Sequence, residues 1–589
     1  MSLALATQRD AARRAANRTS LARAAAILLG ALLMMWPAIF NRYPLLYPDS
    51  ITYLENGSLV ARALFLHQLS DYYGMRSFIY SLGILPFHWN VTLWPIVALQ
   101  AVLTAYVIWL VVQSILPQRT VSWYLALAAL LSLLTSVSWF VSLIMPDILG
   151  PVLYLCIYLL VFARDTLSPP ERFAVAIIAW WAVASHATHL MLAAGICVLL
   201  AAFWVVFRRG FMSGRLRAVG GLAAIVMLAA ASQFALHAYL YGEPSLNGER
   251  PPFLTARLIA DGPGRWYLEQ HCSETKFAGC GRVRELRDDA DQILWGADGV
   301  WKTSSVETQD QMLHEEIPFA LATLRTYPRA QLSKSAANFW LQLNSFEIGF
   351  DANDWMVQQF VHVFPHGKAR FLQSRQAIND LPFDFLSMVQ NWTVVASLVL
   401  IVIFGALQWR RWSSRLVGLA VVIIPAVLAN AFVTGVLSTV EDRYQSRVVW
   451  LVPFLAATLI FAWLAHLQTE PLFTTGNEEV TQKTESRSSR RAPVASHGRA
   501  VLTDSYLTAC RTRRAPHWRK LCLKWSTFQT LRSNAKPARC ESRTFLANRN
   551  RWSSASTAQS PSTTKSRPTK LRNHMPRPST TSSPERPVE

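Results

Sequence analysis

Long stretches of this sequence lack charged residues. Of its 589 residues, 52% are hydrophobic and only 16% are charged, and the hydrophobic residues gather in runs that hold almost no Asp, Glu, Lys or Arg. A run of about 20 apolar residues is what a helix needs to cross a bilayer. The composition therefore excludes a string of soluble domains and predicts an all-α integral membrane protein with many transmembrane helices.

The sequence also lacks a DNA-binding motif, although its formal net charge is +21. Residues 468–589 hold 23 Lys and Arg against 8 Asp and Glu, which accounts for 15 of that net charge. The remaining excess lies mostly in short loops, where basic residues indicate orientation across a membrane. We therefore expect no nucleic-acid partner.

Cysteines are too few and too scattered to form one disulfide framework. Two of the seven, Cys156 and Cys197, lie in apolar runs, where a thiol usually acts as a small hydrophobic side chain. Three more lie in the polar C-terminal stretch. Only Cys272 and Cys280 are spaced like a pair.

Composition divides the chain into five regions. Residues 1–20 are polar and basic. Residues 21–240 hold seven predicted transmembrane helices, with a first loop outside the membrane at 41–77. Residues 241–390 mix both charges with Gly, Pro and Trp and carry helical periodicity, which predicts a mainly helical soluble domain. Residues 391–467 hold three more helices, and 468–589 are rich in Ser, Thr, Arg and Pro, as in a disordered tail.

Ten transmembrane helices are predicted in all. The first is a retained span rather than a signal peptide, because no small-residue cleavage site follows it. The run 173–207 is too long for one helix and is expected to hold two, with a turn from His186 to His189. The helices are expected near 21–40, 91–116, 121–145, 148–162, 173–207 (two), 219–239, 392–407, 416–436 and 448–467.

The arginines of the short loops indicate how these helices are oriented. Alternation of ten helices places fifteen arginines on one side of the membrane and five on the other. Because basic loops stay in the cytoplasm, both termini are predicted there. The opposite, periplasmic side then receives Asp49, Asp147, the two histidines, Arg443 and the 241–390 domain. Since the periplasm is oxidising and Gly279 and Gly281 permit a tight loop, a Cys272–Cys280 disulfide is predicted.

Acidic and basic side chains recur at this outward side, next to predicted helix ends. Asp49 follows Pro48 and is expected to cap a helix that begins at Ser50, with Tyr53 on its next turn. Asp147 follows Met145 and Pro146 at the end of the third span. Arg443, Tyr444 and Arg447 precede the last span, which contains Pro453.

The pattern Asp49-Ser50-x-x-Tyr53 and the pattern Arg443-Tyr444 followed by Pro453 resemble motifs of the GT-C membrane glycosyltransferases. This family takes sugars from polyprenyl-phosphate carriers and includes the protein O-mannosyltransferases and the aminoarabinose transferases. In that family the Asp of the first external loop acts on the acceptor. The resemblance covers the layout of residues 21–467 but assigns no subfamily.

The resemblance implies a chemical role for each charged residue. Phosphate is a good leaving group, so the reaction needs mainly a base and cations. Asp49 is the implied base, which takes the acceptor's proton from the face opposite the phosphate. Arg443 and Arg447, with Tyr444, are the implied phosphate-binding residues, because the guanidinium fork binds two oxygens. Asp147 is the implied second acid, which holds donor or metal.

Purely structural roles are open for the same residues. Asp49 and Asp147 each follow a proline and fit helix caps, and Arg443 fits an interface anchor that pairs with Glu441 or Asp442. The three tryptophans of the domain fit core positions better than sugar-binding platforms; they are Trp266, Trp295 and Trp301.

The histidines have two interpretations as well. His186 and His189 are three residues apart and either cap a turn at the interface or share a face that binds a divalent metal with Asp49 or Asp147. With Tyr53 they are supporting candidates for the site. The sequence does not itself require a metal.

These observations together predict a multi-pass protein of a bacterial inner membrane that moves a sugar from a polyprenyl-phosphate donor to a periplasmic acceptor. Its expected partners are the bilayer, the lipid-linked sugar and that acceptor. The alternatives are a transporter or flippase for lipid-linked glycans, an envelope glycan polymerase and a non-catalytic envelope-assembly protein. The basic tail fits either binding to anionic lipid or an unselected extension.

Overall fold

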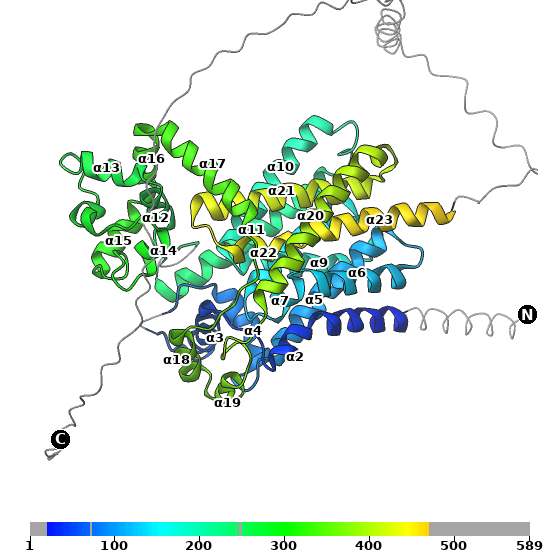
Figure 1. Ribbon diagram of the computed structural model, residues 1–589, viewed down its shortest axis with the longest axis horizontal. Helices are drawn as coiled ribbons and strands as arrows, with labels where there is room; N and C mark the ends of the chain where they lie inside the picture. The colour runs from blue at the N-terminus through cyan, green and yellow to red at the C-terminus, as the bar shows by residue number, and fades with distance from the viewer. Residues whose placement is uncertain (1–19, 71–72, 243, 247–249, 470–589) are drawn as a thin grey trace, which may run out of the picture. The chain divides into compact units, whose positions relative to one another are not determined.

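The computed structural model describes residues 20–70, 73–242, 244–246 and 250–469, and these residues are helical without any strand (Figure 1). The predicted all-α class is confirmed for this part of the chain. The predicted disordered tail, 468–589, and the basic N-terminus, 1–20, lie almost wholly outside the described residues.

Six helical segments are long and apolar enough to cross a membrane, so the described chain fits a multi-pass membrane protein. These six coincide with predicted spans. They are α5 (Trp94–Ile115), α10 (Ala187–Phe207), α11 (Leu216–Tyr241), α20 (Phe383–Gln408), α21 (Ser414–Leu437), and α22 (Asp442–Val449) together with α23 (Leu451–Thr469).

The other four predicted spans run through shorter helices, so the structure supplies six segments of full spanning length where the sequence predicts ten. The first is a helix at Ser20–Met34 followed by α2 (Trp36–Asn41). The second is divided between α6 (Thr120–Leu134) and α7 (Val137–Ser142). The other two are α8 (Leu149–Phe162), after the short helix η1 (Pro146–Ile148), and α9 (Pro169–Ala184).

Polar side chains explain why the 121–145 run is not one helix. Thr135 is extended, and the Ser136 N–H donates to Gln390 Oε1 at 2.7 Å while its hydroxyl donates to the Ser446 carbonyl at 2.6 Å. These bonds satisfy backbone groups that a continuous helix would pair internally. The interruption links this segment to α20 and α22.

A short backbone pairing then fixes the two acidic loops side by side. The Leu45 N–H donates to the Ser142 carbonyl and the Ile144 N–H donates to the Leu45 carbonyl, both at 2.9 Å. Leu45 and Leu143 form an isolated parallel bridge. Because Asp49 follows Leu45 by four residues and Asp147 follows Leu143 by four, the pairing brings both acids to one place.

Two helices continue from the first loop. Helix α3 (Pro48–Leu66) packs against α4 (Phe78–His88). The helix begins at Pro48 rather than at the predicted Ser50, and its N-cap is Tyr47, whose N–H donates to the Ser50 hydroxyl at 2.9 Å. The predicted capping role of Asp49 is therefore wrong, because the proline takes the first helical position and leaves Asp49 in the first turn.

Residues 241–390 contain two different packing units. The first, the α12–α16 domain, has its own hydrophobic core around Ile259, Leu268, Leu294 and Phe319. Its helices are α12 (Phe253–Ala260), α13 (Pro263–His271), α14 (Ala290–Trp295), α15 (Val306–His314) and α16 (Glu316–Thr326), with the short helix η3 (Ala278–Glu285) between α13 and α14.

The second unit packs on the membrane helices instead. Helix α17 (Pro328–Asn344) lies against α21, and α18 (Asp354–Val363) and α19 (Lys368–Leu372) contribute Phe360 and Phe371 to the main core beside Tyr43. A single soluble domain is thus too simple a description of this segment, since part of it covers the first loop.

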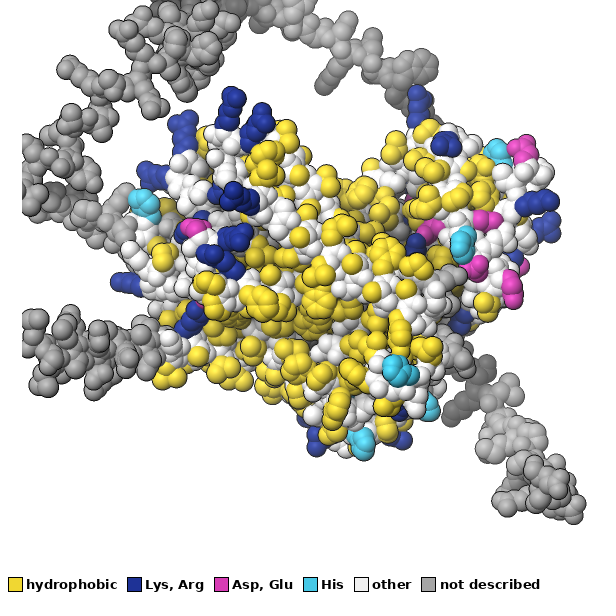
Figure 2. Space-filling view, turned by 180° about the vertical axis from the view of Figure 1, so that it is seen from behind, with side chains coloured by type: hydrophobic (Ala, Val, Ile, Leu, Met, Phe, Trp, Pro, Cys, Tyr) yellow, Lys and Arg dark blue, Asp and Glu magenta, His cyan; other side chains and the backbone are white. Residues whose placement is uncertain are grey.

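Cys272 and Cys280 form a disulfide inside the α12–α16 domain, with Cα atoms 5.5 Å apart. Of the three tryptophans assigned to the core, Trp301 is buried, whereas Trp266 and Trp295 are about 40% exposed. Figure 2 shows hydrophobic side chains over the middle of one face of the molecule, with Lys and Arg gathered toward the end at its left.

Candidate functional site

Two aspartates and three arginines from distant parts of the sequence meet among the membrane helices. We call them the arginine–aspartate cluster: Asp49 on α3, Arg76 just before α4, Asp147 in η1, and Arg443 and Arg447 on α22. The side chains of Asp147 and Arg447 are each 1% exposed and that of Arg443 is 9% exposed. These three charges are therefore held away from bulk water, while Asp49 and Arg76 are partly exposed, at 17% and 24%.

Asp49 lies between two arginines. Its Oδ1 accepts from Arg76 Nη2 at 2.6 Å, and its Oδ2 lies 3.7 Å from Arg443 Nη2. Burial alone raises the pKa of the Asp49 carboxyl, but the two guanidinium groups outweigh it, and the net pKa is lowered from the ordinary value. Asp49 is therefore ionised at neutral pH.

Asp147 is held by Arg443 and Arg447. Its Oδ1 lies 3.3 Å from Arg447 Nη1 and its Oδ2 lies 3.6 Å from Arg443 Nη1. Arg443 thus lies between the two acids. Arg443 and Arg447 are at positions i and i+4 of α22, which puts both on one face of that helix.

Asn430 on α21 completes the contacts of Arg447. Its Oδ1 accepts from Arg447 Nη2 at 3.2 Å, while its Nδ2 donates to the Tyr444 carbonyl at 2.7 Å and to Gln445 Oε1 at 2.9 Å. The amide therefore holds α22 against α21 as well as orienting the arginine. Asn430 was not predicted as a site residue, and its only signal in the sequence is that it is a lone amide within the apolar run 416–436.

Arg76 was also not predicted as a site residue. In the sequence it served only as one of the five arginines on the outward side of the membrane. It stands between Gly74 and Ser77, a segment that Asn56 holds by accepting from the Gly74 N–H at 2.9 Å and donating to the Gly74 carbonyl at 2.8 Å. No local motif distinguishes it. Its role becomes visible only when α3 and α4 pack together.

Arg443 is the least satisfied cation of the cluster. Its two ion pairs, at 3.6 and 3.7 Å, exceed hydrogen-bonding length, and its Nε is buried without a hydrogen-bond partner among the described residues. Its guanidinium carbon lies 4.0 Å from the centroid of the Tyr47 ring and 5.1 Å from that of Tyr444. Among the described residues it forms no ion pair with Glu441 or Asp442, the predicted anchor partners.

The charges of the cluster do not balance. Three guanidinium groups face two carboxylates, which leaves one positive charge in excess. Buried charge is costly unless it is paired. The arrangement is therefore suited to an incoming anion, and the open donors of Arg443 are the groups that would receive it.

Tyr53, His186 and His189 occupy supporting positions. Tyr53 lies one turn along α3 from Asp49, is 1% exposed and packs edge-on against Tyr80 with ring centroids 4.9 Å apart. The two histidine rings are 5.2 Å apart at the junction of α9 and α10.

Each histidine is engaged in that junction. His186 caps α10, since its Nδ1 accepts from the Thr188 N–H at 3.2 Å, and His189 Nδ1 is 2.9 Å from the Ala182 carbonyl. Over the described ranges no group of three or more His, Cys, Asp or Glu side chains is arranged to hold a metal ion. The local geometry therefore favours the turn-capping interpretation of this pair.

Close to the cluster, two acidic side chains join the start of α22 to the α12–α16 domain. Glu441 immediately precedes α22, and its side chain hydrogen-bonds with Asp291 of α14. Burial and this hydrogen bond raise the pKa of Glu441 to about 7, and burial also raises the pKa of Asp291. Two carboxyl groups can share a hydrogen bond only if one is protonated, so this contact carries a proton near neutral pH.

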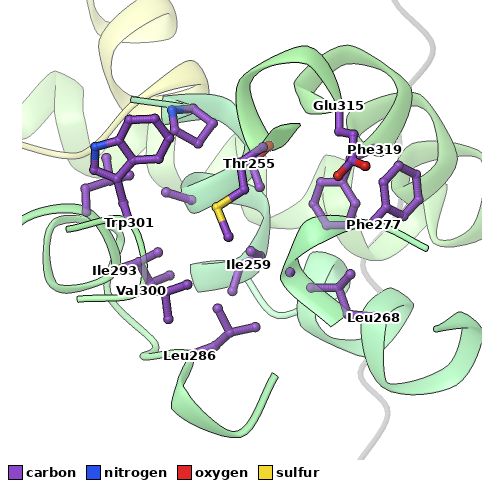
Figure 3. Close-up of a pocket in the computed structure, with 15 residues that line it drawn as sticks. Thr255, Ile259, Leu268, Phe277, Leu286, Ile293, Val300, Trp301, Glu315 and Phe319 are labelled. Carbon is purple, nitrogen blue, oxygen red and sulfur yellow. The ribbon is translucent and has the colours of Figure 1, made fainter. Parts of the chain in front are cut away.

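The α12–α16 domain also encloses a small cavity of about 30 Å³ (Figure 3). Side chains such as Ile259, Leu268 and Trp301 line it, and the only charged side chain in the lining, Glu315, accepts the Ala278 N–H at 2.8 Å. With its acid occupied and its walls apolar, the cavity is a feature of domain packing. The charged groups suited to binding an anion are those of the arginine–aspartate cluster.

Comparison with known proteins does not place the chain in a family. A scan against protein-family models, a search of curated proteins and a search of solved structures each found no match.

Proposed function

We propose that this protein is a membrane glycosyltransferase that moves a sugar from a polyprenyl-phosphate donor to an acceptor outside the cytoplasm. The observation that supports it most is the cluster itself, in which an ionised acid and an under-satisfied arginine lie side by side. Such a pair supplies the base and the phosphate-binding cation that this transfer needs.

In this proposal the donor phosphate binds Arg443 and Arg447, with Tyr444 beside them. Phosphate oxygens that satisfy the open donors of Arg443 compete with its long contacts to Asp49 and Asp147. Asp49 keeps only its bond to Arg76 and is then freer to accept a proton. Asp147 holds Arg447 in place for the donor.

The bonds of the reaction balance without a further reactant. The acceptor oxygen forms a bond to the anomeric carbon, while the bond from that carbon to the phosphate oxygen breaks. The phosphate leaves with the electron pair, stabilised by the two arginines, and the acceptor's proton goes to Asp49. Attack opposite the phosphate inverts the anomeric carbon.

The same proposal assigns the finer topology. Ten transmembrane segments, four of them short, place both termini in the cytoplasm of a cell with an inner membrane. The cluster and residues 241–390 then lie on the periplasmic side. The positive-inside distribution of arginines supports this orientation.

Replacing Asp49 tests the proposal. Asp49→Asn removes the base but leaves Tyr47 and Ser50 to start α3, so this helix should still form. The variant also takes one counter-charge from Arg76 and Arg443, so transfer is measured at matched protein levels. Transfer from a polyprenyl-phosphate sugar in isolated membranes should fall by roughly the hundredfold attributed to general-base catalysis.

Asp147→Asn is the matched control. As a donor-holding acid it should chiefly raise the donor concentration needed for half-maximal transfer. An Asp49→Asn variant that kept more than about a tenth of wild-type transfer, against the hundredfold loss expected for a missing base, would end the catalytic role. Transport of a lipid-linked glycan at the wild-type rate by that variant would favour a flippase instead.

A further inference from the structure

A hollow lined by arginines lies at the end of α8 opposite the cluster. Asp147 lies two residues before the start of α8, whereas Arg164 lies two residues after its last residue, Phe162. The helix has 14 residues and therefore spans about 21 Å. Four arginines line the hollow, which we call the arginine pocket: Arg164, Arg172, Arg215 and Arg217.

The pocket has the size of a ligand site. Its volume is about 470 Å³, within the range of roughly 300 to 1,000 Å³ typical of small-molecule sites. The end of α8, the starts of α9 and α11 and the turn at Ser213 and Gly214 form its walls. Figure 2 shows basic side chains crowded at this end of the described chain.

Positive charge dominates the lining. The one acid there, Asp165, already pairs with Arg415 of α21 at 2.5 Å. Arg172 Nε donates to the Arg164 carbonyl at 3.2 Å, which is a neutral partner. Within the described part of the chain no ion pair is formed by Arg164 or Arg217. Both guanidinium groups are therefore open to an anion.

An aromatic wall gives the pocket a fixed shape. Arg215 lies over the rings of Phe162 and Phe211, at 5.3 and 5.1 Å from their centroids, and the two rings stack 5.3 Å apart. Arg215 also donates to the Phe211 carbonyl. This arginine is thus held by packing on the side of the pocket.

Two large hydrophobic side chains that neighbour pocket arginines in the sequence are exposed, and we call them the rim. Phe173 follows Arg172 on α9, and Leu216 lies between Arg215 and Arg217 at the start of α11. Exposed apolar side chains on spanning helices face acyl chains in a bilayer. The basic hollow therefore opens where lipid chains end and head groups begin.

We propose that the arginine pocket binds the head group of an anionic phospholipid, with the phosphate on Arg164 and Arg217 and the acyl chains along the exposed rim. Loop arginines that only set membrane orientation need no common hollow, whereas basic pockets between membrane helices bind phospholipid head groups. The inference is independent of the proposed reaction, because it concerns the other end of α8.

Lipid titration of the purified full-length protein, followed by native mass spectrometry, tests the site. Phosphatidylglycerol and phosphatidylcholine with identical acyl chains serve as anionic and zwitterionic probes. The wild type should bind phosphatidylglycerol more tightly. At about 1 kcal/mol for each basic residue, Arg164→Gln with Arg217→Gln should weaken that binding roughly thirtyfold and weaken phosphatidylcholine binding much less, because the choline group offsets the phosphate charge.

Two controls separate the pocket from general surface charge and from misfolding. Arg410→Gln with Arg411→Gln removes the same charge from the link between α20 and α21 and should leave phosphatidylglycerol binding unchanged. Arg164→Lys with Arg217→Lys keeps the charges that orient the helices but removes the planar fork, so binding should still weaken in a fully inserted protein.

Three results would overturn the proposal. The first is equal binding by the wild type and the Arg164 and Arg217 glutamine variant. The second is an equal loss in the Arg410 and Arg411 control. The third is displacement of phosphatidylglycerol by an equal concentration of glycerol phosphate, which would make the pocket a site for a soluble phosphate.

Discussion

Arg443 depends on geometry as well as charge for its assigned role. It reaches both acids of the cluster at 3.6 to 3.7 Å and leaves donors open, whereas Arg447 is fixed by Asp147 and Asn430. Arg443→Lys keeps one charge but loses the fork that binds two phosphate oxygens. The variant should insert normally and need a higher donor concentration for transfer, as measured by donor titration in membranes.

The reverse pattern would identify Arg443 as a structural anchor. In that case the lysine variant would accumulate poorly yet transfer sugar normally per molecule. Comparison with Arg447→Lys sharpens the test, because Arg447 is buried against Asn430 and its loss should lower protein stability as well.

The Glu441–Asp291 contact predicts a pH dependence. Burial and Asp291 raise the pKa of Glu441 from 4.5 to about 7, so the folded protein holds a proton that the unfolded chain releases between those values. The contribution of this contact to stability is therefore full at acidic pH and is lost as the pH rises through 7. The thermal midpoint should fall from pH 6 to pH 8.

Glu441→Gln should reduce that fall, because glutamine stays neutral and can still hydrogen-bond to Asp291. The other charged groups that act on the pair are unchanged in the variant; they are Asp289, Arg257, Arg443 and Asp442. An identical pH dependence in wild type and variant would assign the effect to another group.

At the residue scale, sequence reasoning found the cluster members that stand beside motifs and helix ends. Asp49, Asp147, Arg443 and Arg447 were predicted on one side of the membrane, and the structure brings them together. The contact of Arg76 with Asp49 and that of Glu441 with Asp291 each join segments that are far apart in sequence. No local pattern encodes such contacts, so neither was predictable.

At the element scale, the contact between α17 and α21 depends on the absence of a side chain at Gly435. A Cβ there would lie 2.7 Å from Gln342 Cβ and 2.8 Å from the Asn338 carbonyl oxygen of α17. Because a backbone oxygen cannot rotate aside, Gly435→Ala should push the helices apart. Overpacking of this kind costs roughly 1 to 3 kcal/mol, more than the ~1 kcal/mol gained in helix propensity.

The thermal midpoint in detergent measures this effect. Gly405→Ala on α20 is the control, since a Cβ at that position meets nothing within 4 Å. It should leave the midpoint unchanged or raise it slightly. A Gly435→Ala protein as stable as the Gly405→Ala protein would show that α17 does not rely on this close approach.

The boundaries of elements followed the sequence where apolar runs were uninterrupted. The boundaries of α5, α10, α11 and α21 lie within a few residues of the predicted ones, whereas α20 begins at Phe383, nine residues before the predicted start at Trp392. The 121–145 run was misjudged because hydropathy does not register Thr135 and Ser136 as a break. The Ser136 N–H bonds to Gln390 of α20 and the Ser136 hydroxyl bonds to Ser446 of α22, contacts that average hydropathy cannot reveal.

At the scale of the whole molecule, two clusters of charge stand at opposite ends of α8. The arginine–aspartate cluster combines both signs in buried positions, while the arginine pocket is open and almost wholly basic. The positive-inside rule assigns the purely basic end to the cytoplasm. The two ends therefore predict opposite compartments for two segments of the chain, the turn at Met212 and the α12–α16 domain.

Reporter fusions test that assignment. A phosphatase that is active only outside the cytoplasm should be active when fused after Val300, inside the α12–α16 domain, and inactive when fused after Met212, beside the arginine pocket. A reporter that is fluorescent only in the cytoplasm should give the opposite pattern at the same two positions. The two fusion points are separated by α11, whose 26 residues suffice to cross a bilayer, so they should never report the same side. Cytoplasmic activity at Val300 would place that domain in the cytoplasm. The arginine–aspartate cluster would then lie on the wrong side for an external acceptor, because Glu441, two residues before Arg443, contacts Asp291 of the domain.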